Sequence, residues 1–367
     1  MKKLKKSVVI AIFMILVSFN FYMVSFRSDY NEPSSKDTSI LKQNDIIIPD
    51  VSEIVHDESH PLIIPDRKNE TDILVMVMGQ LKFLDKWYNI LKSVDASISF
   101  VYASYDIQIS QEQNATYLDD ATFPFKAKFI PGTTWTQGRN MLAKEAVRLE
   151  KKRGKKFSHW LFMDDDINVK CEDEMIRIVY GNESCWQNVF NFISSSKVPE
   201  NISTIGAIPE LNPQPGLQAV STADAYFAAF KREYVPYMLP YGKLSKGFSQ
   251  WMSQAALFCI MRTCLESSIA RIPYIRIEND LSRSYKRGVY IHQMKRIIKY
   301  NFVTEELGFE NCMKYTLADV NQGLGATEVV PLVESEKFSS LIPSPELTKC
   351  ASMKRRFETW EKRILLA

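Results

Sequence analysis

The chain has 367 residues, of which 46% are hydrophobic, and its formal net charge at pH 7 is +3. This length and composition allow a full hydrophobic core to be buried. The small net charge gives no bias toward nucleic acid, so we expect no nucleic-acid partner.

The N-terminus has the composition of a membrane anchor. Four lysines within residues 2–6 precede an uncharged stretch over residues 7–26, close to the roughly 20 residues that a helix needs to cross a bilayer. Because the lysines come first, the positive-inside rule predicts a cytosolic tail over residues 1–6 and a lumenal body. A cleaved signal peptide is the alternative, but no small-residue cleavage pair follows the apolar core. We therefore expect a single-pass type II anchor that binds the protein to the membrane.

The rest of the chain agrees with a lumenal body. Four N-glycosylation sequons begin at Asn69, Asn114, Asn182 and Asn201, which is mild support because short motifs also occur by chance. All six cysteines lie beyond the anchor, and an even number of cysteines allows pairing in an oxidising compartment. Residues 27–70 are rich in Ser, Asp, Lys and Pro, which predicts an extended stem. We expect a Golgi or ER membrane protein.

From residue 72 the pattern alternates between strands and helices. Apolar runs predict strands at 73–78, 98–103, 126–130 and 160–163, and three- and four-residue spacing predicts helices at 83–94 and after the segment 131–138. Such alternation is typical of an α/β fold with a mostly parallel, Rossmann-like sheet flanked by helices, whose ligands bind at the carboxyl ends of the strands. Further strands are predicted at 202–208 and 223–232, and a short terminal helix around 353–366.

Three consecutive carboxylates, Asp164, Asp165 and Asp166, end the fourth of these strands. Adjacent like charges repel one another and resist burial, so they need a cation or open water at this position. Oxygen ligands suit a hard divalent ion such as Mg²⁺ or Mn²⁺, which in turn suits a phosphate-bearing substrate. A solvated acidic turn is the alternative for a triplet considered alone.

Residues 72–169 resemble the nucleotide-sugar-binding half of glycosyltransferases with the GT-A fold. The likeness rests on a glycine-containing loop, an Arg-Asn pair near the start of a helix (Arg139 and Asn140), and a later strand that ends in Asp-x-Asp. It implies that Asp164 faces the nucleotide ribose, that Asp166 holds the metal on the donor diphosphate, and that Asp165 assists either role. We also include Asp164 among the expected metal ligands.

Arg139 and Asn140 have two interpretations. A guanidinium near the start of a helix can meet the anionic donor, helped by the positive end of the helix. Alternatively, Asn140 and Thr136 cap the helix while Arg139 is solvated.

The second half of the chain is less explicit about chemistry. Asp224 is one candidate for sugar binding or for the general base that deprotonates an acceptor hydroxyl, although a turn-capping Asp would look the same. Residues 247–254 lie where many inverting members of the GT-A group keep an acidic base, but no carboxylate occurs there. The base therefore stays open among Asp224, Glu210, Glu278 and Asp280, and so does the choice between inversion and retention.

His292 is the one histidine placed like the C-terminal metal ligand of many GT-A enzymes. A neutral imidazole would complete Mn²⁺ coordination beside Asp166. A histidine flanked by apolar residues is also common in a core, which is the alternative here.

Together these patterns predict a divalent-metal-dependent glycosyltransferase that moves a sugar from a nucleotide-sugar donor to a glycan or glycoprotein acceptor. The catalytic domain would span residues 71–330, and 331–367 would form a C-terminal tail. A metal-dependent phosphotransferase or nucleotidyltransferase is a second hypothesis, because it can share an acidic strand end. A non-catalytic, membrane-anchored carbohydrate-binding protein is a third.

Overall fold

The computed structural model describes residues 71–118, 123–171, 184–195, 198, 202–206, 216–220, 226–242, 253, 257, 268–272, 275–279, 326–331 and 351–366. They all belong to the second of two compact units, Pro61–Ala367. The predicted cytosolic tail (1–6), anchor (7–26) and stem (27–70) lie outside the described residues, and so do Asp224 and His292. Within these ranges no helix is both long enough and apolar enough to cross a membrane.

The described strands form one large sheet and one small sheet. They are β1 (Asp72–Gly79), β2 (Ser97–Ser104), β3 (Phe125–Phe129), β4 (His159–Asp164), β5 (Ile167–Cys171), β6 (Ile202–Gly206), β7 (Gly216–Val220), β8 (Phe227–Lys231), β9 (Ser268–Arg271), β10 (Ile275–Asn279) and β11 (Ala326–Pro331). The large sheet has nine strands in the order β11-β7-β9-β6-β8-β4-β1-β2-β3, and β5 pairs with β10 in the small one. Only β7 and β8 run against the others, so seven of the nine strands point the same way. The prediction of a mostly parallel α/β fold is confirmed.

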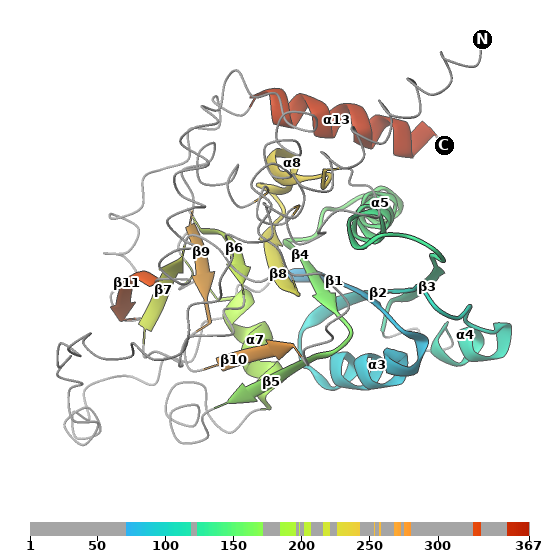
Figure 1. Cartoon of the computed structure of the whole chain (residues 1–367), viewed down its shortest axis with the longest axis horizontal. Helices are drawn as coiled ribbons and strands as arrows, with labels where there is room; N and C mark the ends of the chain where they lie inside the picture. Colours follow the sequence, from blue (N-terminus) through green and yellow to red (C-terminus); the bar gives the residue numbers. More distant parts are fainter. Residues whose placement is uncertain are drawn as a thin grey trace, which may run out of the picture. The chain divides into compact units, whose positions relative to one another are not determined.

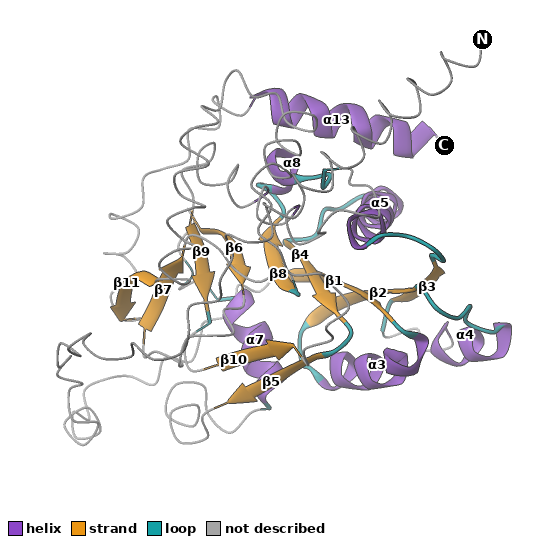
Figure 2. Ribbon diagram, in the orientation of Figure 1, coloured by secondary structure: helices purple, strands orange, loops and turns teal. Residues whose placement is uncertain are grey.

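Helices cover both faces of the large sheet (Figures 1 and 2). The described helices are the 3-10 turn η1 (Leu81–Phe83), α3 (Leu84–Ser93), α4 (Gln111–Leu118), α5 (Trp135–Arg153), α7 (Cys185–Ile193), α8 (Val235–Met238) and α13 (Ala351–Leu366). Helices α5, α8 and α13 share one apolar core with one face of the sheet. Helices α3 and α7 share a second core with the other face.

The central strand β1 is apolar throughout because both of its faces are buried. Leu74 and Met76 pack in the core beneath α5, whereas Ile73, Val75 and Val77 pack in the core beneath α3. A strand buried on both faces reads as a continuous apolar run rather than an alternating one. This is why the sequence pattern located β1 and β4 within one or two residues of their ends.

Helix α5 begins earlier than its sequence predicts. It starts at Trp135, and Thr134 caps it by accepting a hydrogen bond from Gln137 N in a capping box. The alternative in which Thr136 and Asn140 form the cap is therefore wrong. Gly138 made the segment look like a loop, but it lies inside the helix, where an added Cβ would be 2.1 Å from the sulfur of Met78. The glycine allows α5 to pack closely on β1.

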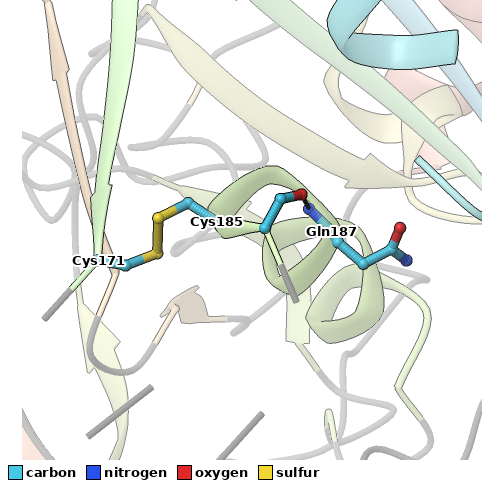
Figure 3. The surroundings of a disulfide bond; sticks show 4 residues. Cys171, Cys185 and Gln187 are labelled. Atoms are coloured by element: carbon cyan, nitrogen blue, oxygen red, sulfur yellow. Dashed lines mark hydrogen bonds between the residues drawn. A yellow bond between two sulfur atoms is a disulfide. The ribbon is translucent and has the colours of Figure 1, made fainter. Parts of the chain in front are cut away.

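A disulfide joins the end of β5 to the start of α7. Cys171 and Cys185 are 14 residues apart in sequence, and their Cα atoms are 5.8 Å apart (Figure 3). Next to it, the Ser184 hydroxyl accepts a hydrogen bond from Gln187 N at 3.2 Å and caps α7. The pairing could not be read from the sequence, and helix α7 was not predicted. The prediction that the cysteines beyond the anchor can pair holds for these two.

Candidate functional site

The aspartate triplet lies where three parallel strands end side by side. In the sheet register Met78 of β1 is opposite Asp164 of β4, and Gly79 is opposite Ser104 of β2. The carboxyl ends of β1, β2 and β4 therefore form one edge, and the turn made by Asp165 and Asp166 projects from it before β5 begins. This is the edge at which ligands of open α/β sheets bind.

Asp164 is positioned by two side chains of α5. Its Oδ1 accepts a hydrogen bond from Trp135 Nε1 at 3.2 Å and forms an ion pair with Arg139. The Arg139 side chain is fully buried, and its guanidinium carbon lies 4.8 Å from the Trp135 ring centre and 5.4 Å from that of Phe162. The alternative of a solvated Arg139 is therefore wrong. The guanidinium lies in the core and pairs with the Asp164 carboxylate from there.

The Asn140 side chain forms two hydrogen bonds with the backbone of Tyr241, which lies far away in the sequence. Its Nδ2 donates to the carbonyl oxygen of Tyr241 at 2.9 Å, and its Oδ1 accepts from Tyr241 N at 2.8 Å. The Tyr241 ring then packs edge-on against Trp135, with ring centres 5.4 Å apart. Asn140 thus helps to hold Trp135, and through it Asp164, in place.

Asp165 is the buried member of the triplet. Its side chain is 7% exposed, and its Oδ2 accepts a hydrogen bond from Gln80 N at 2.6 Å. Trp87 Nε1 donates to its carbonyl oxygen at 2.9 Å. The carboxylate packs against Gly79, where an added Cβ would be 2.1 Å from Asp165 Cβ. Burial, together with the charges of Asp166 and Asp164, raises the pKa of Asp165 to about 6.

Asp166 is partly exposed in the same turn. Tyr105 directly follows β2, and the charges of all three aspartates act on its hydroxyl. Burial and the charges of Asp165, Asp106, Asp166 and Asp164, in that order, raise the pKa of the Tyr105 hydroxyl to about 12. The hydroxyl therefore keeps its proton at neutral pH and can donate a hydrogen bond. Tyr105 was not predicted, although its place directly after a strand in the same parallel sheet as β4 was a usable signal.

The Asp106 side chain stabilises the loop that follows β2. Its Oδ1 accepts hydrogen bonds from Leu81 N at 2.9 Å, from the Ser104 hydroxyl at 2.8 Å and from Ile107 N at 2.8 Å. The carboxylate thus ties the start of η1 to the end of β2. It was also missed, because a single Asp after a strand usually indicates no more than a turn.

Of the four candidates for the general base, Glu278 alone lies among the described residues. It sits on β10 and pairs with Lys170 of β5 at 2.6 Å and with Arg276 at 2.6 Å. The hydrogen bond from Lys170 and the charge of Arg276 lower the pKa of Glu278. A carboxylate with a lowered pKa is a weaker base, which disfavours Glu278 for this role.

The described part of the chain contains no group of three or more His, Cys, Asp or Glu side chains close enough to hold a metal ion. Asp165 is buried and its Oδ2 accepts from Gln80 N, whereas Asp164 and Asp166 are the two carboxylates of the triplet that are partly exposed. Both hydrogen bonds from side chains to Asp164 end on Oδ1. One or two carboxylates completed by substrate phosphates and water are a usual donor set for Mg²⁺, so the residues present fit such an ion.

The chain shows only distant similarity to known proteins. No protein-family model matches the sequence, and no curated protein does. Among solved structures, a mannosyltransferase from Pyrobaculum calidifontis in complex with GDP-Man and Mn²⁺ matches 84% of this chain and 88% of its own at 8% identity and a TM-score of 0.37. Mouse xyloside xylosyltransferase 1 in its apo form matches 45% of this chain and 68% of its own, at 11% identity and a TM-score of 0.25. At these scores the site has to be interpreted from its own residues.

Proposed function

We propose that this protein is a glycosyltransferase that uses a nucleotide-sugar donor and a divalent metal ion, Mn²⁺ or Mg²⁺. The observation that carries the proposal is the carboxylate turn at the joint end of β1, β2 and β4. There Asp164 is fixed by a buried arginine, and Asp166 is left at the surface of the turn. Such rigid positioning of a charged group, supported from the core, is typical of a site built for binding and catalysis.

Asp164 and Asp166 would hold the ion together with oxygens of the donor diphosphate. When bound, the ion neutralises the negative charge that develops on the departing nucleoside diphosphate. Tyr105, still protonated at neutral pH, would donate a hydrogen bond to the donor from the end of β2. Arg139 and Asn140 would serve the donor indirectly, because both hold the surroundings of Asp164.

The acceptor side rests on residues outside the described part of the chain. We keep Asp224 as the proposed sugar-binding residue or general base, and His292 as a proposed further metal ligand. The pH dependence of Mn²⁺ affinity tests His292, because a ligating imidazole must lose its proton before it binds. The variant His292→Ala should weaken Mn²⁺ binding and flatten that dependence, whereas His159→Ala, at the opposite end of β4, should not. If His292→Ala binds Mn²⁺ as tightly as His159→Ala does, His292 is not a metal ligand.

A lumenal location in the Golgi or ER, with a type II anchor, is part of the proposal. The disulfide between Cys171 and Cys185 supports it, since such bonds persist in oxidising compartments. Treatment of the protein from animal cells with peptide-N-glycosidase should lower its apparent mass. An unchanged mass, together with digestion of the body by protease in intact microsomes, would reverse the proposed orientation.

A panel of nucleotide sugars tests the function itself. The full chain in detergent with Mn²⁺ should release nucleoside diphosphate from one or a few donors and from no others, and release should rise when a suitable glycan acceptor is added. Loss of release on addition of EDTA and recovery with Mn²⁺ would support the metal. Donor binding without turnover for any acceptor would indicate a carbohydrate-binding protein. Transfer of phosphate or of the nucleotide would indicate a metal-dependent phosphotransferase or nucleotidyltransferase.

A further inference from the structure

A cavity lies at the end of β4 opposite the aspartates. It has a volume of about 640 Å³, and its lining includes Ser158 and His159 at the start of β4, Lys231 at the end of β8, and Lys354 of α13. Strand β4 has six residues from His159 to Asp164, which places the two ends about 16 Å apart at roughly 3.3 Å per residue. A volume of this size is in the range of small-molecule sites.

The charges around this cavity are mainly positive. Lys156, Lys231 and Lys354 line it, and Glu233 is the one carboxylate among the lining residues. Arg232 also lines the cavity, but its charge is already compensated because its Nε and Nη2 donate to Glu150 at 2.8 Å each. The lysines therefore give the cavity a net positive charge.

Helix dipoles explain the position of only one of these three lysines. Lys156 follows the end of α5, where a cation is stabilised by the helix dipole whether or not a ligand binds. Lys354, in contrast, lies in the first turn of α13, where the dipole disfavours a cation. Lys231 comes from a strand. Three lysines from three separate parts of the chain thus line one cavity, and neither Lys156 nor Lys354 forms an ion pair with a described residue.

The remaining lining suits an ester rather than a bare ion. Hydroxyl side chains in the lining belong to Thr71, Ser158, Ser194 and Ser195, of which Ser158 already donates to the carbonyl oxygen of Asp72 at 2.7 Å, and apolar surface comes from Phe157, Ile193, Val198, Pro236 and Tyr237. Hydroxyls and ammonium groups donate hydrogen bonds to phosphate or sulfate oxygens. The apolar surface has room for the carbon skeleton that carries such a group.

We propose that this cavity binds a small organic phosphate or sulfate monoester, such as a phosphorylated sugar, at a site separate from the aspartate turn. The anionic group would lie among Lys156, Lys231 and Lys354. The carbon skeleton would lie against the apolar lining. The proposal does not depend on the proposed transferase activity, because the two sites occupy opposite ends of the sheet.

Calorimetry on the full chain in detergent, at physiological salt, tests the site with glucose 6-phosphate and with glucose as its neutral counterpart. The ester should bind and glucose should not. The double variant Lys156→Gln/Lys354→Gln should lose at least about tenfold in affinity, because two charge-assisted contacts are removed. The matched control is Lys151→Gln/Lys152→Gln, in the last turn of α5 and outside the lining, which should bind like the parent.

Two further probes distinguish the sources of the anion. Inorganic phosphate that binds as tightly as the ester would identify the free ion as the ligand, and vesicles containing phosphatidic acid that bind in place of both would identify a lipid headgroup. Equal loss in the control variant, equal binding of glucose, or binding that disappears at physiological salt would each overturn the proposal. Equal binding of glucose would show that the anionic group is not recognised, and either of the other two results would show diffuse attraction to a basic surface instead of a site.

Discussion

The Arg139 guanidinium is fully buried, whereas the Asp164 carboxylate with which it pairs is 17% exposed at the end of β4. The pair therefore spans the boundary between the core beneath α5 and the candidate site. A buried charge needs a partner, so the buried Arg139 guanidinium holds the Asp164 side chain in one position. The packing of α5 on the sheet thus fixes the position of the Asp164 carboxylate.

Replacement of Arg139 by Met should destabilise the fold. Breaking a buried pair by removing one partner typically costs about 3–5 kcal/mol, and Asp164 would then lack its main partner. Chemical denaturation at pH 7 measures the change in the free energy of unfolding. Lys152→Met on the exposed face of the same helix serves as the control and should change little. A stability of Arg139→Met equal to that of the parent would contradict the pairing.

Gly79 should tolerate no side chain while Asp165 is present. Because a Cβ at residue 79 would lie 2.1 Å from Asp165 Cβ, Gly79→Ala should destabilise by about 1–3 kcal/mol through overpacking. The contact is with Cβ, so Asp165→Gly should relieve much of that cost even though it loses the bond from Gln80. A double-mutant cycle from urea denaturation measures the coupling. Costs that add within about 0.5 kcal/mol would show that the two residues do not touch.

The sequence predicted the first four strands, most plainly β1 and β4, because burial on both faces leaves a continuous apolar pattern. It gave β1, β2, β3 and β4 within one or two residues of their ends. It missed the pairing of β5 with β10, because a short strand is recognised only by its distant partner.

The roles within the site could be predicted only in part. A triplet of aspartates indicates a carboxylate turn, yet it does not tell which side chain turns inward. That depends on the space above Gly79, the last residue of β1, and on the backbone N–H of Gln80 that follows it, which donates to Asp165. The role of Arg139 likewise depends on burial between two aromatic rings, one of them on β4.

Asp166 should be needed for ligand binding and dispensable for folding, since its side chain lies at the surface of the turn. Asp166→Asn should abolish Mn²⁺-dependent binding of the donor that the panel identifies, with the melting temperature of the metal-free protein little changed. The matched control is Glu112→Gln on α4, an exposed carboxylate away from the turn. Calorimetry with donor plus Mn²⁺ gives the affinities. Equal binding by Asp166→Asn and the parent would exclude Asp166 as a metal ligand.

The Cys171–Cys185 disulfide should contribute measurably to stability. In the chain-entropy description, a bridge over a separation of 14 residues stabilises by about 3 kcal/mol. The double variant Cys171→Ser/Cys185→Ser should therefore unfold at a lower temperature. A reducing agent should lower the melting temperature of the parent more than that of the variant. Alkylation of both thiols in native protein from animal cells would show that the bridge does not form.

The Glu145 carboxylate provides a test of pH dependence away from the site. It lies on α5 with a side-chain exposure of 1%, and it binds Lys126 and, at 2.5 Å, Lys128 of the edge strand β3. Burial alone would raise the pKa of Glu145, but the hydrogen bonds and charges of the two lysines outweigh burial and lower it. The interaction thus stabilises the fold fully above the unfolded-state pKa of 4.5.

As the pH falls below that value, the unfolded chain takes up the proton before the folded one does, so this contribution to stability declines. Glu145→Gln should cost about 1–3 kcal/mol at pH 7, and the difference from the parent should shrink steadily below pH 4.5. Carboxylates such as Asp72 titrate in both proteins and cancel in the difference. Exposed Glu358→Gln on α13 is the control and should follow the parent at every pH. Urea denaturation of the three proteins from pH 7 downward decides, because a difference that stays constant with pH would mean that Glu145 contributes through packing and not through its charge.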